Sequence, residues 1–374
     1  MDFGAVSQKS GTALYAGQDW QLVERKTVTE ALTSYAFSNL TGDSETEYRL
    51  ISYVKNGYAG GVIVKLNINA DSTAGNYGYQ MTRGVNTTAS ASRDTGATPY
   101  LGMVTTDSSR NVSLSDVTIS AKTGTIRVGL TKLVGCIAGT DIYNIDHHGW
   151  AWNNSANEIT SLSVVADQTG GLGVGTDLFL FARRLGGSVA TAGQRFGTMN
   201  IKGTLSAGMF VLKERYEVTG SAVTSKTFSG LTGNTNPIYL IKARFVDKDG
   251  VDYFLTQLNA DSGSNYGWQE IAGVNTTVSA ARATGRSSFR VGSAGTDGQI
   301  SISETILYAK SGNARVGITE FASGISTTTV TNIKLQGEAW SNTTDEITSL
   351  VITPSANKLG VGTVIELYQL QIGV

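Results

Sequence analysis

The sequence predicts an all-β protein built as two tandem antiparallel β-sandwich domains of the jelly-roll kind. Three observations lead to this prediction: a turn-rich composition of low charge, short segments of alternating polarity, and an internal duplication. The 374 residues include 45 glycines, and only 16% of them are charged. With its many Ser, Thr and Asn residues, this composition is typical of β structure with frequent turns, and no segment keeps a helical period.

Alternating polarity predicts the individual strands. In residues 62–68, apolar side chains at every second position would face a core while the polar ones between them face away. The second half of the chain keeps this pattern, with Phe254 and Leu258 at two of the core positions. Other short apolar runs, such as 126–130, end at Gly, Asn, Asp or Ser. This spacing indicates a jelly-roll-like sandwich.

The duplication predicts the number of domains. Three pairs of segments repeat at offsets of 190, 189 and 188 residues: 69–80 with 259–269, 84–88 with 273–277, and 151–162 with 339–350. This period is far too long for a solenoid. Because the repeat begins at Phe3-Gly4 and again at Phe196-Gly197, we expect a first domain at 1–184, a short flexible Gly-rich joint at 185–195 and a second domain at 196–374.

Charge and cysteine content exclude several classes of protein. The net charge is −1 and the basic residues are dispersed, so direct binding of nucleic acid is not expected. The single Cys136 excludes an intrachain disulfide. We find no basic leader and no apolar run of membrane-spanning length. The sequence therefore predicts a protein made in a reducing cytoplasm without a signal peptide and without membrane insertion.

The order of the repeated motifs resembles the β-sandwich domains of tailed-bacteriophage virion proteins. In each copy, Asn-Tyr-Gly precedes Tyr79 or Trp268, Glu-Ile-Thr-Ser-Leu follows a Trp, and Gly-Val-Gly-Thr precedes a closing aliphatic strand. The resemblance covers about 37–181 and 228–368. It implies an exterior virion protein, such as a capsid decoration protein, a head fibre or a tail fibre, that forms a trimer. The chain differs from a long tail fibre in lacking a heptad or collagen-like shaft and a separate adaptor domain.

The only two histidines, His147 and His148, are adjacent. On a strand they would point to opposite faces, so they could not jointly hold a metal ion without a bulge. Asp71 and Asp261 lie in Asn/Ser/Gly-rich loops, where side-chain oxygens could bind Ca²⁺. Such residues also satisfy the backbone of a turn, and no spacing here matches a defined calcium loop. The sequence leaves ion binding by these two loops open and predicts no metal or cofactor site.

Glu158 and Glu346 are the carboxylates present in both copies. A glycosidase needs two carboxylates at a controlled separation, and the sequence supplies no second acid that must meet either glutamate. We expect these glutamates to protect strand edges from unwanted pairing. Because no nucleophile, base and orienting group can be assembled, the sequence predicts no catalytic residues and no enzyme activity.

Several aromatic residues are candidates for a binding surface. Trp152 with Trp340, and Tyr79 with Trp268, are equivalent pairs that could present flat rings to a sugar or could anchor a core or a subunit interface. Trp150 has no aromatic twin. The stretch from His147 to Trp150, together with the loop 92–107, is therefore the predicted surface patch specific to the first domain. The Asn-x-Thr sites at Asn86, Asn275 and Asn342 are formal glycosylation acceptors only.

Three classes of function follow. The first is a non-enzymatic capsid decoration or head-fibre protein that binds itself and other virion proteins, such as the major capsid protein. The second is a tail fibre or adhesin that binds a host surface glycan or receptor. The third is a polysaccharide depolymerase. Two complete domains, a short joint and no shaft favour the first class.

Overall fold

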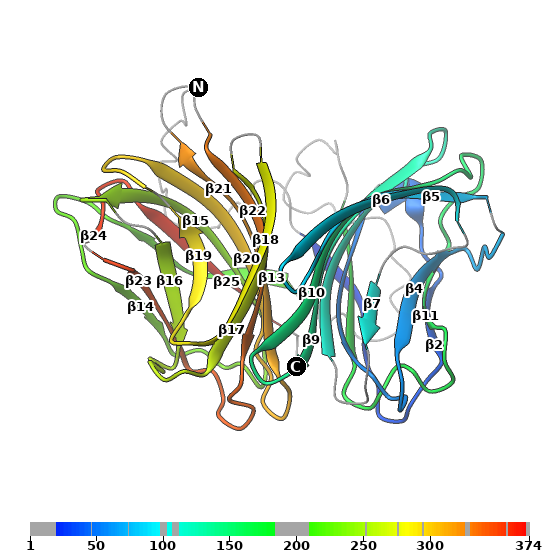
Figure 1. Cartoon of the computed structure of the whole chain (residues 1–374). Helices are drawn as coiled ribbons and strands as arrows, with labels where there is room; N and C mark the ends of the chain where they lie inside the picture. The colour runs from blue at the N-terminus through cyan, green and yellow to red at the C-terminus, as the bar shows by residue number, and fades with distance from the viewer. Residues whose placement is uncertain are drawn as a thin grey trace, which may run out of the picture.

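The computed structural model describes residues 20–45, 47–73, 75–97, 103–106, 112–183, 209–250, 253–274, 277–293, 295–325, 330–356 and 358–371. These residues form antiparallel sheets arranged as two sandwiches side by side (Figure 1). The described part contains one short helix, α1 (Gly42–Glu45). The fold class predicted from the sequence is confirmed: the chain is all-β, with two tandem antiparallel sandwiches of the jelly-roll kind.

The first sandwich packs a large sheet against a small one. The large sheet has the order β6 (Thr88–Ala97), β5 (Tyr77–Val85), β10 (Asp141–Trp152), β9 (Arg127–Ala138), β8 (Val112–Ser120), β3 (Glu47–Lys55), β12 (Asp177–Arg183) and β1 (Gln21–Thr27). The small sheet has the order β2 (Ser34–Ser38), β11 (Ser161–Ala166), β4 (Val62–Ile68) and β7 (Met103–Thr106).

The second sandwich repeats this topology strand for strand. Its large sheet has the order β18 (Thr277–Arg286), β17 (Tyr266–Val274), β22 (Asn332–Trp340), β21 (Arg315–Ile325), β20 (Ile300–Tyr308), β15 (Ile238–Lys248), β25 (Val364–Gln371) and β13 (Met209–Glu217). Its small sheet has the order β14 (Lys226–Ser229), β23 (Ser349–Pro354), β16 (Tyr253–Leu258) and β19 (Phe289–Ser293), and β24 (Lys358–Leu359) pairs with β15. The predicted joint at 185–195 and both boundaries beside it lie outside the described residues.

Each sandwich has a core of its own between its large and small sheets. Strand β4 alternates buried and half-buried positions as predicted, with Val62, Val64, Leu66 and Ile68 inside. Strand β16 does the same in the second core, where Phe254 and Leu258 are buried. Burying such side chains contributes about 1.5–3 kcal/mol each. Two independent cores of this kind are what the duplication predicts.

A third core joins the two sandwiches. It lies between the outer faces of the two large sheets and contains residues of both, among them Ile51, Tyr53, Val134, Ile238 and Tyr308. At one edge, Gln21 of β1 pairs with Met209 of β13, so that the two large sheets continue into one 17-stranded sheet. The sequence did not predict this core. The two sandwiches therefore contact each other through the outer faces of their large sheets rather than through their loops.

Candidate functional site between the two large sheets

Asp71 and Asp261 each hold together the loop in which they lie. The Nε1 of Trp152 donates to Asp71 Oδ2 at 2.8 Å, and Trp340 donates to Asp261 Oδ2 at the same distance. A second donor, the side-chain amide of Asn76 or Asn265, lies 2.9 Å from the same oxygen. Both aspartates also accept a backbone N–H two residues ahead. These contacts assign the two carboxylates to loop structure, the turn role that the sequence favours.

A buried arginine beneath each loop completes the repeated module. Arg127 and Arg315 are fully buried, and the guanidinium carbon of each lies 5.6 Å from the ring centroid of Trp152 or Trp340. The guanidinium groups donate to backbone carbonyls of the following loop, at Asn154 and Asn157 in the first sandwich. Sequence reasoning missed this role, although the arginine recurs at the same place in both copies. The buried Trp152 and Trp340 are core anchors, so they are not sugar-binding platforms.

Glu158 and Glu346 bind backbone N–H groups. Glu158 Oε1 accepts the N–H of Asp43 at 3.2 Å, and Glu346 Oε1 accepts the N–H of Asn234 at 3.0 Å. Both precede their strands, β11 and β23, by three residues. Their observed role is to fasten a neighbouring loop, which differs from the strand-edge protection expected from the sequence.

The prediction of a surface patch from His147 to Trp150 is wrong, because half of this stretch is buried. His148 is 0% exposed and Trp150 is 3% exposed, because alternation along β10 turns both into the first core. The Nε1 of Trp150 donates to Thr131 Oγ1 at 3.1 Å. His147 points to the other face, as the sequence predicts, and burial lowers its pKa. Only His147 and Gly149 of this stretch face outward.

The second sandwich has a polar cluster where the first has Trp150. Glu338 takes that position and is fully buried, and burial raises the pKa of this carboxyl well above its usual value. Gln336 donates to Glu338 Oε1 at 2.9 Å. Nearby, Arg290 lies over the rings of Tyr253 and Trp268 at 3.8 and 4.0 Å. Gln336 also donates to the backbone carbonyl of Arg290, so these groups pack together inside the second sandwich.

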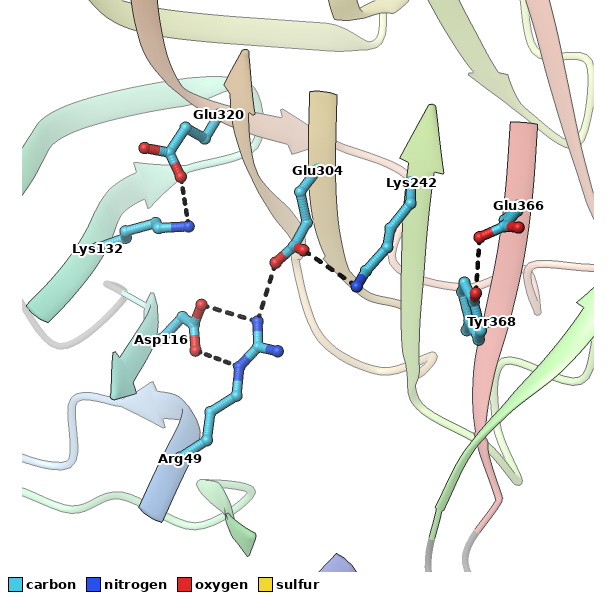
Figure 2. Close-up of polar contacts among 8 residues, drawn as sticks. All are labelled: Arg49, Asp116, Lys132, Lys242, Glu304, Glu320, Glu366 and Tyr368. Carbon is cyan, nitrogen blue, oxygen red and sulfur yellow. Dashed lines mark hydrogen bonds and ion pairs between the residues drawn. The ribbon is translucent and has the colours of Figure 1, made fainter. Parts of the chain in front are cut away.

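Charged side chains of both sandwiches meet where the two large sheets face each other. Figure 2 shows Arg49 between two carboxylates: it binds Asp116 through two bonds of 2.7 and 2.9 Å and Glu304 of the second sandwich at 3.2 Å. Lys132 binds Glu320 across the same interface at 2.6 Å. Burial opposes ionisation of Asp116, but the charge of Arg49 holds the pKa of Asp116 below its usual value. These ion pairs therefore fix the position of one large sheet relative to the other.

Two hollows flank this cluster. One, of about 400 Å³, is lined by both sandwiches and includes Arg49, Asp116, Leu240 and Glu304. The other, of about 750 Å³, lies on the second large sheet alone, over residues that include Ile302, Glu320, Ala322 and Ile333. Among the described residues no three His, Cys, Asp or Glu side chains gather closely enough to hold a metal ion. Arginine–carboxylate pairs beside exposed aliphatic side chains are suited to protein–protein contact.

The one cysteine lies near this interface. Cys136 is buried in the third core, and burial raises the pKa of its thiol to about 12. A thiol with so high a pKa is a poor nucleophile. In the described ranges, no helix is long and apolar enough to cross a membrane.

Comparison with known proteins identifies no family. No family model and no curated protein matches the chain. Among solved structures, the LG1-3 region of the laminin α2 chain aligns at 8% identity over 91% of this chain and 65% of that one, with a TM-score of 0.20. Domains LG4-5 of the mouse laminin α1 chain align at 8% identity over 98% of this chain and 92% of that one, with a TM-score of 0.17. At such scores neither likeness supports an inference.

Proposed function

We propose that the chain is a non-enzymatic structural protein on the exterior of a bacteriophage virion, acting as a capsid decoration or head-fibre protein through protein–protein contacts. Its partners would be further copies of itself and other virion proteins, such as the major capsid protein. The placement on a virion rests on the resemblance in motif order. The contact mechanism rests on the outer faces of the large sheets.

The observation that carries the proposal is the exposure of large aliphatic side chains on those faces. Val128 and Leu130 of β9 are 53% and 54% exposed, and Ile302 and Ile333 on the second large sheet are 55% and 61% exposed. Such side chains grouped on a regular sheet face favour binding to another protein surface. In contrast, the repeated polar residues Asp71, Glu158 and Arg127 are occupied by hydrogen bonds within the fold.

Two experiments test the proposal. Purified particles of the encoding phage should contain the chain, and density for it should lie on the head lattice. Particles that lack the chain would overturn the proposal. Incubation with host polysaccharide should release no reducing sugar. Release that is abolished by Glu158→Gln or Glu346→Gln would instead establish a depolymerase.

A tail-fibre or adhesin role is the second candidate. It is favoured by a shallow hollow of about 390 Å³ on the first sandwich, whose lining includes the polar residues Gln80, Arg93 and Asp94. A few polar side chains in a hollow suit a small polar ligand such as a sugar. Density at the tail tip, together with glycan binding that is lost in Arg93→Ala, would support this role over decoration of the head.

A further inference from the structure

The polar hollow between the two large sheets, here the shared hollow, is built by both sandwiches. The first sandwich contributes Arg49, Asp116 and Lys132 to its lining, and the second contributes Lys242 and Glu304. Its volume of about 400 Å³ lies within the range of pockets that hold small ligands, which is about 300–1,000 Å³. The shared hollow therefore exists only where the two large sheets face each other.

Arg49 presents a nitrogen without a protein acceptor to the shared hollow. The residue is only 7% exposed, and Asp116 and Glu304 accept the hydrogen bonds of its Nε and Nη2 atoms. Its Nη1 has no acceptor among the described residues, and it turns towards the side where Lys242 lies (Figure 2). A guanidinium group stays protonated in a protein, so Nη1 keeps two N–H donors. A buried donor of this kind favours a ligand that supplies the acceptor.

The two lysines of the shared hollow also have donors to spare. The Nζ of Lys242 lies 3.7 Å from Glu304, and this lysine side chain is 49% exposed. Lys132 binds one carboxylate, Glu320, at 2.6 Å. An ammonium group has three N–H donors, so neither lysine is saturated by these contacts.

The carboxylates in the lining, in contrast, are already engaged. Both oxygens of Asp116 accept hydrogen bonds from Arg49. One oxygen of Glu304 lies 3.2 Å from Arg49, and the other faces Lys242. Among its described lining residues, the shared hollow thus offers N–H donors and holds no carboxylate that lacks a cation. A ligand that accepts hydrogen bonds and carries negative charge would complete it.

The charge of the lining favours a ligand with one negative charge. Its four cations are Arg49, Lys132, Arg183 and Lys242, and its two carboxylates are Asp116 and Glu304. Two further carboxylates, Glu47 and Glu320, bind Arg183 and Lys132 from outside the lining. Because four carboxylates lie in or beside the shared hollow, they would repel a phosphate group, which carries nearly two charges, more than a carboxylate.

The cations that face the ligand are not repeated by the duplication. The strand registers place Leu240 of the second sandwich at the position of Arg49 in the first. In the same way, Glu320 takes the position of Lys132. The shared hollow is therefore a single site in the chain, and it lies where the two copies differ in charge.

Aromatic rings complete the lining. Trp20 and Tyr368 both line the shared hollow and are half-buried. The Nζ of Lys242 lies 6.0 Å from the centroid of the Tyr368 ring, so a cation and a flat apolar surface stand side by side. A ring with a polar edge and an apolar face, such as that of a sugar, fits this combination.

We propose that the shared hollow binds a sugar acid of monosaccharide size. Its carboxylate would accept hydrogen bonds from Arg49 Nη1 and Lys242 Nζ, and its ring would lie against Tyr368. The inference does not depend on the proposed function, because the shared hollow is built whether or not the chain lies on a virion.

The first test is calorimetric titration of the full chain with glucuronate, glucose and inorganic phosphate. Glucuronate should bind, and both glucose and phosphate should bind at least about tenfold more weakly, because each lacks either the carboxylate or the ring. The inference is overturned if glucuronate does not bind. It is also overturned if glucose or phosphate binds as tightly as glucuronate, since the site would then not be specific for a sugar acid.

The second test locates the bound glucuronate. Arg49→Lys keeps a positive charge for Asp116 and removes Nη1, and Lys242→Gln removes the more exposed cation. Each should weaken glucuronate binding about tenfold or more. Since Arg49 is buried, thermal unfolding checks that its variant is folded, and Lys242→Gln tests the site at a side chain that can change without disturbing the core.

Two control variants complete this test. Lys248→Gln is matched to Lys242→Gln, because Lys248 is 43% exposed, also binds a carboxylate and lies outside the shared hollow. Arg93→Ala changes the separate hollow on the first sandwich. Both controls should bind glucuronate as wild type does. Unchanged binding in Arg49→Lys and Lys242→Gln, or equal weakening in either control, would place the ligand elsewhere and overturn the inference.

Discussion

The rings of Tyr53 and Tyr308 stack face to face across the two sandwiches, with centroids 3.9 Å apart and planes inclined by 10°. Both side chains are fully buried, and the Tyr308 hydroxyl donates to Asp177 Oδ2 at 2.6 Å. A stacked pair and a charged hydrogen bond therefore join the two sandwiches. From the sequence we could predict only that they follow one another in the chain. Both residues belong to the third core.

Removing the Tyr308 ring should weaken the whole chain. We expect Tyr308→Ala to lower the free energy of unfolding by about 3–5 kcal/mol, because it leaves a cavity in the third core. Tyr308→Phe should cost about 1–3 kcal/mol, because Asp177 loses a buried donor. Urea unfolding measures both, with the exposed Tyr58→Ala as control. Equal stability of Tyr308→Ala and wild type would show that the sandwiches do not depend on each other.

Gly149 lies opposite Leu130 just as Gly337 lies opposite Ile318, so the two glycines are equivalent in the two sandwiches. They should respond differently to the same substitution. Gly337→Val forces a side chain into Val134 and should cost about 1–3 kcal/mol of stability by overpacking. Gly149→Val meets open space and should leave the melting temperature of the single chain unchanged or raised. Thermal unfolding of the two variants at low concentration tests this pair. Equal losses in both would contradict the difference in packing around the two glycines.

Asp71 should make the protein sensitive to acid. Partial burial acts to raise the pKa of Asp71, but hydrogen bonds from Trp152, Thr73 and Asn76 outweigh it and lower the pKa to about 2. The unfolded value is about 3.9, so the ionised form contributes stability above that pH, and this contribution is lost as the pH falls through the folded pKa. In Asp71→Asn, the loss of stability from about pH 4 to pH 2 should be shallower than in wild type.

The equivalent aspartate supplies the comparison for that experiment. The pKa of Asp261 is also lowered, by the hydrogen bonds of Trp340 and Asn265 acting against partial burial. Asp261→Asn should therefore change the slope in the same direction. Urea unfolding at a series of pH values measures the slopes, and two variants with the wild-type slope would show that these carboxylates do not titrate with folding.

Glu338 should make the protein less stable as the pH rises, which is the opposite of the effect of Asp71. Its raised pKa means that the fold stabilises the neutral carboxyl, so the stability it contributes is present below the unfolded pKa of about 4.3 and is lost as the pH rises towards the folded pKa. Glu338→Gln keeps a neutral side chain of the same shape. It should gain stability relative to wild type as the pH rises above about 4.3. Urea unfolding of both proteins at a series of pH values measures this gain.

Much of the fold could be predicted because it depends on local patterns. Period-two alternation places Val62, Val64, Leu66 and Ile68 inside. The same rule sends His147 and His148 to opposite faces. The prediction of a surface patch failed because it treated neighbouring residues as one site. Trp150 follows His148 at an interval of two, so both enter the core.

The roles of the repeated polar residues could be predicted only in part. Asp71 has the turn role that its loop composition favours, but its bond to Trp152 joins residues far apart in the sequence. Glu158 and Arg127 also bind groups on distant segments. A sequence shows that a residue recurs, but it does not show which donor or acceptor lies beside it after folding.

The sequence by itself determined the all-β class and the equivalence of the two halves, because turn chemistry, alternation and repetition are all local properties. Only the tertiary structure decided that the halves share a third core and that they meet asymmetrically. Gly149 and Gly337 occupy equivalent strand positions, but a Cβ atom added at Gly337 would collide with Val134, whereas the nearest atom to one added at Gly149 lies 4.0 Å away. The physical reason is that β10 and the strands β17 and β22 on which it packs are distant in the chain, so their complementarity exists only once both sheets are formed.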